Sequence, residues 1–249
     1  MIFSPRLNLF FKLLFSESSS KDYPLFLSFE VLSKFFDEDD LKKIKNDIET
    51  ISDGRIRASL RDDGFYLFYP FFDIVFLLLE KGYPYTELSY MLDWRDFERY
   101  VANIFMKIGF ETVLNFHFSY NQVRREIDIL AKIDNTLLCI DAKHWKKGVL
   151  ESKLKILATQ QKDRCSLLAE YISKCRKNID SIFSSNYVHS KLHIFPLIIT
   201  LYRTKYCIIE KIPIVPANLL KQFPTWFDIN KYSLWHISIM INKKSKNNW

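Results

Sequence analysis

Cysteine is scarce in this sequence, and its scarcity excludes a protein held together by disulfides or zinc. The four cysteines are spread over 249 residues and form no Cys-x-x-Cys pair. Such spacing suits neither a disulfide framework nor a tetrahedral zinc site. We interpret them as small buried hydrophobic residues and expect a reducing, cytoplasmic location for the protein. They are Cys139, Cys165, Cys175 and Cys207.

Long apolar runs are also missing. No segment reaches the roughly 18 apolar residues needed to cross a bilayer, so we expect no membrane association. The apolar stretch 7–15 contains Lys12 and is not followed by a small-residue cleavage site, so it predicts a helix and not a signal peptide. The chain is nevertheless 48% hydrophobic, which favours a folded core over disorder.

The net charge of +7 is unevenly distributed along the chain. From Asp93 onward there are 25 Lys and Arg residues against 14 Asp and Glu, a balance of +11. Before Asp93 there are 11 against 15, a balance of −4. A polyanion is therefore expected to bind the second part. A basic surface that is merely solvated is the alternative.

The first 70 residues predict three helices followed by a β-hairpin. Apolar residues recur at helical spacing, and two alternating segments then flank the turn Asp62-Asp63-Gly64. This order resembles a winged helix-turn-helix in pattern, although no motif supports it. Winged helices bind DNA or contact proteins, and the net acidity of this half favours the second role. The helices are expected at 7–15, 28–36 and 37–51, the strands at 55–60 and 65–68, and the wing arginines are Arg55, Arg57 and Arg61.

Residues 71–92 predict a helical connector between residues 1–70, the winged-helix-like domain, and residues 93–249. An apolar helix is expected at 71–80, and Thr86 is placed to cap a short helix that ends at Met91.

Asp93 opens the segment that carries the candidate chemistry. It is placed to cap a helix in which Leu92 and Phe97 occupy the positions of a hydrophobic staple. Gly109 is placed to end that helix. Glu98 lies in the first turns at the margin of the buried stripe, where its carboxylate can point along a sheet edge instead of into solvent.

Three strands follow the helix, and polar residues mark the last two. The first is expected at 111–118. The second, 126–131, places Asp128 on the face opposite its isoleucines. The third, 137–143, is apolar until it ends in Asp141-Ala142-Lys143. Residues two apart in a strand share a face, so Asp141 and Lys143 project together.

These residue types suit metal-assisted hydrolysis of a phosphodiester. Mg²⁺ takes oxygen ligands and retains several waters, and Asp128 and Asp141 on adjacent strands form a suitable pair of carboxylates. The Ala142 carbonyl can add a third oxygen. Lys143 is placed to orient or deprotonate the attacking water, and Glu98 to complete the metal shell.

The order helix-Glu, strand, hairpin with Asp, and Asp-x-Lys resembles the PD-(D/E)xK nuclease superfamily. Phe97-Glu98, Gly109-Phe110 and the segment 126–131 are most similar to its Mrr-like and archaeal Holliday-junction-resolvase-like branches. The resemblance implies an α/β fold with a restriction-endonuclease-like αβββαβ core over 93–223 and Mg²⁺ or Mn²⁺ as cofactor. It also implies catalytic and metal-binding roles for Glu98, Asp128 and Asp141, and a catalytic role for Lys143.

Two departures from the superfamily pattern stand out. Arg124-Arg125 replaces the glycines common before the hairpin Asp, and Gln160-Gln161 is not followed by a tyrosine four residues later. A site role for either glutamine is therefore in doubt. Glu126 is expected to face solvent or form an ion pair, and His117, His189, His193 and His236 are expected to be structural.

Basic residues around the expected site suit phosphate contacts, which position a duplex without reading its sequence. Arg164 belongs to the same basic cluster on the helix after Lys143. The predicted DNA-binding residues are Arg124, Arg125, His144, Lys146, Lys147, Lys153, Lys155 and Lys162.

The leading hypothesis is a metal-dependent DNA endonuclease. A non-catalytic DNA-binding or regulatory protein that uses the nuclease fold as a scaffold is one alternative. A structure-specific junction resolvase is another, and it would act as a homodimer because two strands must be cut symmetrically.

Overall fold

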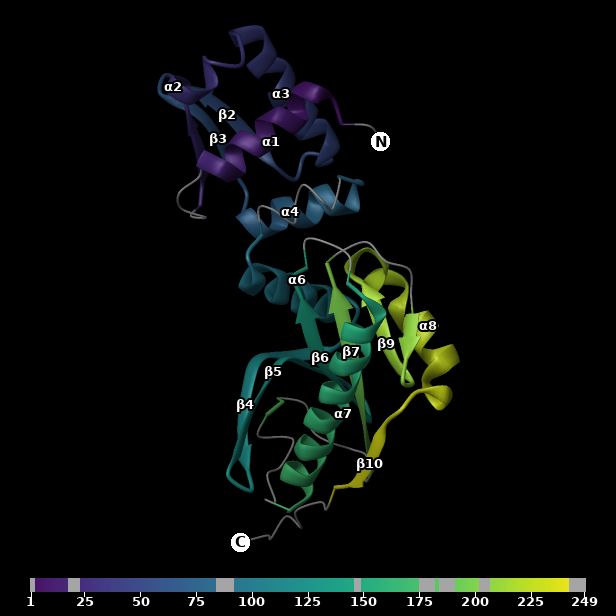
Figure 1. The fold of residues 1–249 in the computed structure, drawn as a ribbon. Coiled ribbons are helices and arrows are strands. Elements are labelled where there is room, and N and C mark those ends of the chain that lie inside the picture. Colours follow the sequence, from purple (N-terminus) through teal and green to yellow (C-terminus); the bar gives the residue numbers. More distant parts are fainter. Residues whose placement is uncertain are drawn as a thin grey trace, which may run out of the picture. The chain divides into compact units, whose positions relative to one another are not determined.

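Two units, residues 1–91 and 92–249, make up the chain. The computed structural model describes residues 3–17, 23–83, 92–145, 149–174, 182–183, 191–201 and 207–241. Both units are drawn in Figure 1. Among the described residues, no helix is both long and apolar enough to cross a membrane.

The first unit packs helices on one face of a small antiparallel sheet. Among the described strands the order is β1-β3-β2. Phe10 of α1 lies 4.7 Å, ring to ring, from Phe65 of β3, so the apolar stripe of α1 covers the inner face. The elements are α1 (Pro5–Glu17), β1 (Leu25–Ser28), α2 (Phe29–Leu32), α3 (Glu38–Ile51), β2 (Arg57–Arg61), β3 (Gly64–Phe68) and α4 (Phe71–Glu80).

The structure confirms the helices expected at 7–15, 37–51 and 71–80 and corrects another. Asp37 caps α3 by accepting a hydrogen bond from the Asp40 N–H, and the hairpin β2–β3 forms where alternation predicted it. The helix expected over 28–36 is wrong in length, because α2 ends at Leu32 and β1 precedes it. The short helix expected to end at Met91 lies outside the described residues.

The second unit contains the order α6-β4-β5-β6-α7-β7, the αβββαβ arrangement that the sequence predicts. Its described strands form a seven-stranded mixed sheet of order β4-β5-β6-β7-β9-β8, with β10 paired to β7. The elements are α6 (Trp94–Lys107), β4 (Glu111–Tyr120), β5 (Val123–Ile133), β6 (Thr136–Lys143), α7 (Glu151–Lys174), β7 (Lys191–Thr200), β8 (Cys207–Ile209), β9 (Ile212–Pro216), η2 (Ala217–Gln222), α8 (Phe223–Asn230), η3 (Lys231–Ser233) and β10 (Ile237–Met240).

Strand β6 is almost continuously apolar because both of its faces are covered. Leu137 and Cys139 pack against Cys165 and Leu168 of α7. Leu138 and Ile140, which alternate with them, are also fully buried. Its parallel partner is β7, which requires a crossover connection, and α7 is part of that crossover (Figure 1). The site residues at the end of β6 are thus held by a rigid scaffold.

The β4–β5 hairpin extends beyond β6 as an arm, which we define as residues 116–127 (Figure 1). Its two-residue turn has left-handed backbone at Asn121 and Gln122, as hairpin turns of this length require. Asn115, also left-handed at φ 50°, interrupts the β4–β5 pairing. Tyr171 of α7 supports the arm through a ring contact of 5.3 Å with Phe118.

Candidate active site

Asp128 lies at the fork where β5 separates from β6. Backbone pairing between these strands runs as far as Ile129 and Ile140 and stops there. Beyond that pair, the Ala142 N–H donates a 2.8 Å hydrogen bond to Asp128 Oδ2. The Asp128 side chain therefore replaces a backbone carbonyl of the ladder, and this bond fixes the direction in which its carboxylate points.

Asp141 is buried at the end of β6 and is contacted by two cations. Its Oδ1 accepts hydrogen bonds from Lys143 Nζ at 2.8 Å and from Arg164 Nη1 at 2.7 Å. Only 2% of the Asp141 side chain is exposed, so the negative charge requires such partners. The contact with Lys143 confirms that these two residues share a face of the strand.

The helix α7 contributes a pair of residues to this network. Arg164 Nη1 also donates to Gln161 Oε1 at 3.1 Å, and Gln161 Nε2 donates to the Cys139 carbonyl at 2.8 Å. Gln161 thus links β6 to the guanidinium that holds Asp141. Sequence reasoning left Gln161 in doubt and assigned Arg164 to phosphate contacts. Gln161 and Arg164 are three residues apart and so lie on one face of a helix, and this spacing is the sequence signal that could have indicated a joint role.

Glu98 on α6 is buried close to the other carboxylates. Burial, and then the charges of Asp128 and Glu126, raise the pKa of Glu98 to about 7, although Lys143 lowers it. Burial and then the charge of Asp141 also raise the pKa of Asp128, against the hydrogen bond from Ala142. Two carboxyl groups here therefore hold protons more tightly than usual, as expected where negative charges gather without enough neutralisation.

The oxygen donors fit a hard divalent cation that keeps water ligands. Among the residues the structure describes, no three His, Cys, Asp or Glu side chains form a group that could enclose one metal ion. Mg²⁺ does not need such a cage, since one or two carboxylates and several waters are its usual ligands in phosphate-processing sites. Asp128 and Asp141 would provide the two carboxylates, and a cation between them would oppose the burial and the repulsion from Asp141 that raise the pKa of Asp128.

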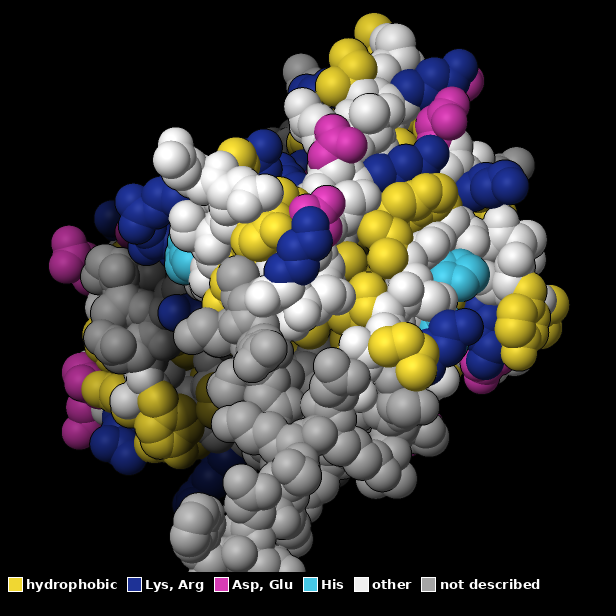
Figure 2. Space-filling view, turned by 90° about the horizontal axis from the view of Figure 1, so that it is seen from below, with side chains coloured by type: hydrophobic (Ala, Val, Ile, Leu, Met, Phe, Trp, Pro, Cys, Tyr) yellow, Lys and Arg dark blue, Asp and Glu magenta, His cyan; other side chains and the backbone are white. Residues whose placement is uncertain are grey.

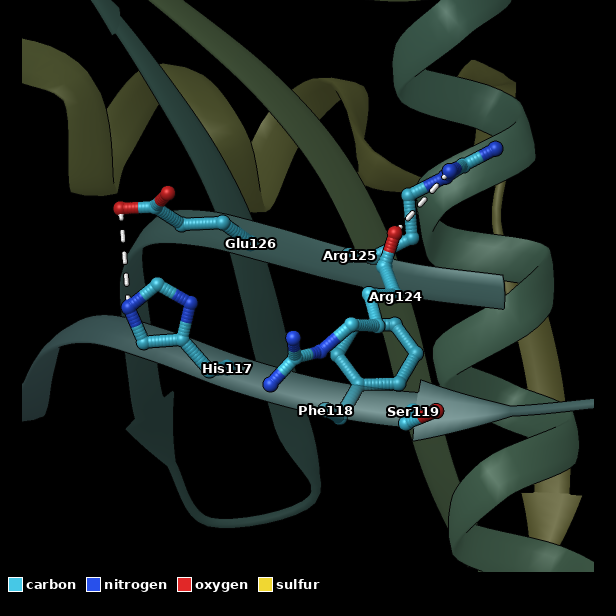
Figure 3. Close-up of a pocket in the computed structure, with 6 residues that line it drawn as sticks. All are labelled: His117, Phe118, Ser119, Arg124, Arg125 and Glu126. Atoms are coloured by element: carbon cyan, nitrogen blue, oxygen red, sulfur yellow. Dashed lines mark hydrogen bonds and ion pairs between the residues drawn. The ribbon is translucent and has the colours of Figure 1, made fainter. Parts of the chain in front are cut away.

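Arg124 and Arg125 lie on the arm and line a surface pocket, shown in Figure 3. Their side chains point in different directions, and Arg125 Nη1 donates to the Arg124 carbonyl at 3.1 Å. His117 Nε2 and Glu126 Oε1 face each other across the strands at 3.9 Å, and Glu126 is exposed, which agrees with the expectation that it faces solvent or forms an ion pair. The remaining lining residues are Phe118 and Ser119.

The other predicted DNA-binding residues are distributed along α7 and after β6. Lys155 pairs with Glu151 at 3.2 Å and Lys162 with Glu210 at 3.6 Å. The Lys153 ammonium lies 5.7 Å from the Trp145 ring centre. Lys146 and Lys147 lie outside the described residues.

His144 is half-buried, with its ring centre 6.0 Å from that of Phe97. Figure 2 shows, on the face seen from below, Lys and Arg side chains spread among hydrophobic ones and not gathered in a single patch.

Comparison with known proteins identifies the segment that holds the site. Residues 89–167 match a family model described as restriction endonuclease (Mrr_cat). This segment is a PD-(D/E)xK nuclease domain. The superfamily resemblance read from the sequence is thereby confirmed. The matched segment of the nuclease domain extends into α7, so it includes Glu98, Asp128, Asp141, Lys143, Gln161 and Arg164.

A search of the curated proteins finds no sequence match to the chain. Among solved structures, the chain is similar to AF1548, a protein of unknown function, with 20% identity and a TM-score of 0.25 over 43% of this chain and 46% of that one. It is also similar to VC1899 from Vibrio cholerae, with 13% identity and a TM-score of 0.33 over 93% of this chain and 57% of that one. The chain therefore spans about half the length of these two proteins.

Proposed function

We propose that the protein is a Mg²⁺- or Mn²⁺-dependent endonuclease that hydrolyses phosphodiester bonds of DNA. The observation that carries the proposal is the meeting of Asp128, Asp141 and Lys143 at one end of β6 within a nuclease domain. A buried carboxylate and a half-buried one next to an ammonium group suit a reaction that needs a hard cation, a positioned water and charge neutralisation at the phosphate.

Each residue has a distinct role in this proposal. Asp128 and Asp141 would hold the metal with the Ala142 carbonyl, and Glu98, which forms no three-carboxylate group with them, would hold one of the metal's waters. When bound, the metal supplies a Lewis acid and lowers the pKa of a water molecule. Lys143 Nζ, fixed against Asp141 Oδ1, orients that water and neutralises charge on the phosphate.

The remaining basic residues hold the DNA backbone. Arg124 and Arg125 contact phosphates from the arm, together with His144 and Lys153. Lys155 can join them because an exposed ion pair such as the one it forms with Glu151 contributes little, about 0–1 kcal/mol, and opens readily. Lys162, half-buried, would join them by leaving Glu210. The order α1-β1-α2-α3-β2-β3 supports a winged-helix-like first unit.

The proposed enzyme would act as a homodimer if it cuts both strands of a DNA duplex, because two symmetric cuts need two active sites.

The decisive experiment is a panel of labelled duplex, single-stranded, flap and four-way-junction DNA incubated with Mg²⁺, Mn²⁺ or EDTA. We expect cleavage with either metal, none in EDTA, and none by Asp141→Ala or Lys143→Gln. Asp163→Ala is the matched control, because Asp163 is an exposed acid on α7 beside Arg164. If the wild type cleaves no DNA form and binds no metal, the enzyme proposal is wrong.

A second candidate is a DNA-binding protein that uses the nuclease fold without catalysis. It is favoured by the full charge pairing of Asp141, whose Oδ1 already contacts Lys143 and Arg164. This candidate predicts DNA affinity that is undiminished in EDTA, with no cleavage under any metal. A preference for the four-way junction would instead identify a resolvase.

A further inference from the structure

The outer face of the small sheet in the first unit is lined by aromatic rings and arginines. Alternation in β3 turns Phe65 and Leu67 into the core, so Tyr66 and Phe68 project from the opposite face. Phe26 of β1 pairs with Tyr66 and joins them there. We call Phe26, Tyr66, Phe68, Arg57 and Arg61 the aromatic face.

The rings of the aromatic face form a row. The centres of Phe26 and Tyr66 are 4.8 Å apart, and those of Tyr66 and Phe68 are 6.2 Å apart with planes only 20° from parallel. The Arg61 guanidinium lies 4.8 Å from the Tyr66 ring centre and 5.5 Å from that of Phe68. Phe26 is 37% exposed although it is a large apolar residue.

A glycine makes room for this row. A Cβ at Gly64 would lie 2.6 Å from Phe26 Cε2 and 2.2 Å from the Leu27 carbonyl oxygen, closer than real side chains approach. Gly64 does not have a positive φ, so its backbone conformation does not require glycine. The missing side chain instead lets the Leu27 carbonyl and the Phe26 ring approach β3 closely.

We propose that the aromatic face binds the unpaired bases of a single-stranded nucleic acid. Every base has a π-face, and stacking on an aromatic side chain is tolerant of sequence. Bases inside a duplex are already stacked, so only an unpaired strand can use this row. Arg61, whose guanidinium lies over the Tyr66 and Phe68 rings, and Arg57 on the same face supply positive charge for the phosphates between those bases.

The composition of the face favours this ligand over a protein. The other outward positions of the three strands are Ser28, Ser59 and Gly64, so no Leu, Ile or Val projects among the rings. Asp63 lies at the turn beside the row and accepts a hydrogen bond from the Tyr66 hydroxyl. Because this turn is acidic, the bound nucleic-acid strand would run away from it, towards Arg57. The choice of a polynucleotide also rests on the proposed nuclease function of the second unit.

The adjacent helix α3 does not offer a comparable cationic surface. Its first turn is Glu38-Asp39-Asp40, and Lys42 is paired with Glu38 at 2.8 Å and with Asp39 at 3.8 Å. A helix with this sequence is poorly suited to enter a duplex groove lined by phosphates. Within the first unit, the sheet therefore offers the better nucleic-acid surface.

The test is fluorescence anisotropy of the full chain with labelled oligothymidine and oligouridine of equal length, in EDTA so that no strand is cut. The double variant Phe26→Leu/Phe68→Leu keeps apolar contacts but removes two rings. We expect it to bind at least about tenfold more weakly, since each stacked base contributes about 1–3 kcal/mol. Phe35→Leu is the matched control, because Phe35 is 50% exposed outside this face. Comparison of the two strands separates DNA from RNA as the ligand.

Arg61→Gln gives an independent readout if the double variant does not fold, since Arg61 is exposed, and a several-fold loss is expected. Unchanged affinity in both variants, an equal loss in Phe35→Leu, or equally tight binding of a duplex through the same residues would overturn the proposal. Strand binding by a protein that cleaves no DNA form with Mg²⁺ or Mn²⁺ and binds neither metal would support the aromatic face and reject the nuclease. DNA cleavage by the wild type, together with unchanged strand affinity in the Phe26→Leu/Phe68→Leu and Arg61→Gln variants, would support the nuclease and reject the aromatic face.

Discussion

Asp128 accepts, through its side chain, the backbone hydrogen that Ala142 would otherwise donate across the sheet, at 2.8 Å. One group thus serves both the strand ladder and the proposed metal site. Asparagine retains a carbonyl oxygen that can accept this bond, whereas alanine does not. The two substitutions therefore separate the structural role of Asp128 from its chemical role.

Replacing Asp128 by alanine should lower the free energy of unfolding by about 1–2 kcal/mol, because the Ala142 N–H loses its partner. Asp128→Asn should be at least as stable as the wild type in EDTA, since it also removes repulsion from Asp141. Neither variant should cleave DNA. Urea unfolding and a cleavage assay measure both effects, and equal stability of the two variants would contradict the role assigned to the hydrogen bond.

Arg164→Gln should destabilise the metal-free protein by about 1–3 kcal/mol, because a buried carboxylate loses one of its two cationic partners. Mg²⁺ should reduce this loss by replacing the missing charge. Urea unfolding with EDTA and with Mg²⁺ measures both parts of the prediction. Lys155→Gln on the same helix removes only an exposed ion pair and should change stability by less than about 1 kcal/mol. If Lys155→Gln lost as much stability as Arg164→Gln, the burial of Asp141 would not account for the effect of Arg164→Gln.

Glu98 should make the metal-free protein less stable as pH rises from about 4.5 to about 7. Its pKa is raised to about 7 in the folded chain from 4.5, so the folded state keeps a proton that the unfolded chain has lost. The contribution is fully present below pH 4.5 and disappears as pH rises through about 7, and it amounts to at most about 3 kcal/mol.

The measurement is denaturant unfolding in EDTA at pH 5 and pH 8 for the wild type and Glu98→Gln. The glutamine variant should lose less stability between these two values, because it lacks the titrating group. Identical pH dependence of the two proteins would show that Glu98 titrates normally and is not crowded by the other carboxylates.

Arg124→Gln should weaken duplex binding and flatten its salt dependence. Each phosphate contact contributes about 0.9 to the slope of log K against log salt, so the slope should fall by roughly one. Affinities measured at several salt concentrations in EDTA give the slope directly. Lys221→Gln, which changes an exposed lysine on η2, should leave the slope unaltered. If the slope for Arg124→Gln equals that of the wild type, Arg124 on the arm does not contact DNA phosphates.

Local sequence patterns predicted the elements that carry the site. Asp93 forms a capping box with Asp96 at the start of α6, and Gly109 follows the helix with a φ of 96°. Both features depend on neighbouring residues and can be read directly. The shared face of Asp141 and Lys143 is equally local, because it follows from the two-residue repeat of a strand.

Contacts between distant segments could not be predicted in the same way. Arg164 reaches Asp141 only because α7 is rotated so that this residue points at β6, 23 positions earlier in the chain. As a sequence feature, Arg164 is simply one of several basic residues on a long helix. Strand β1 was missed for a related reason: its four residues are stabilised by pairing with β3, far along the chain.

The match to the nuclease family ends before the strand that pairs with β6 on its second edge. Strand β7 lies after residue 167 and pairs in parallel with β6 along its whole length, from Thr136 to Lys143. A fragment limited to 89–167 would leave β6 as a bare, apolar edge with unpaired backbone groups, which is a template for aggregation. We therefore expect soluble expression of the candidate site residues to require the chain at least through β7.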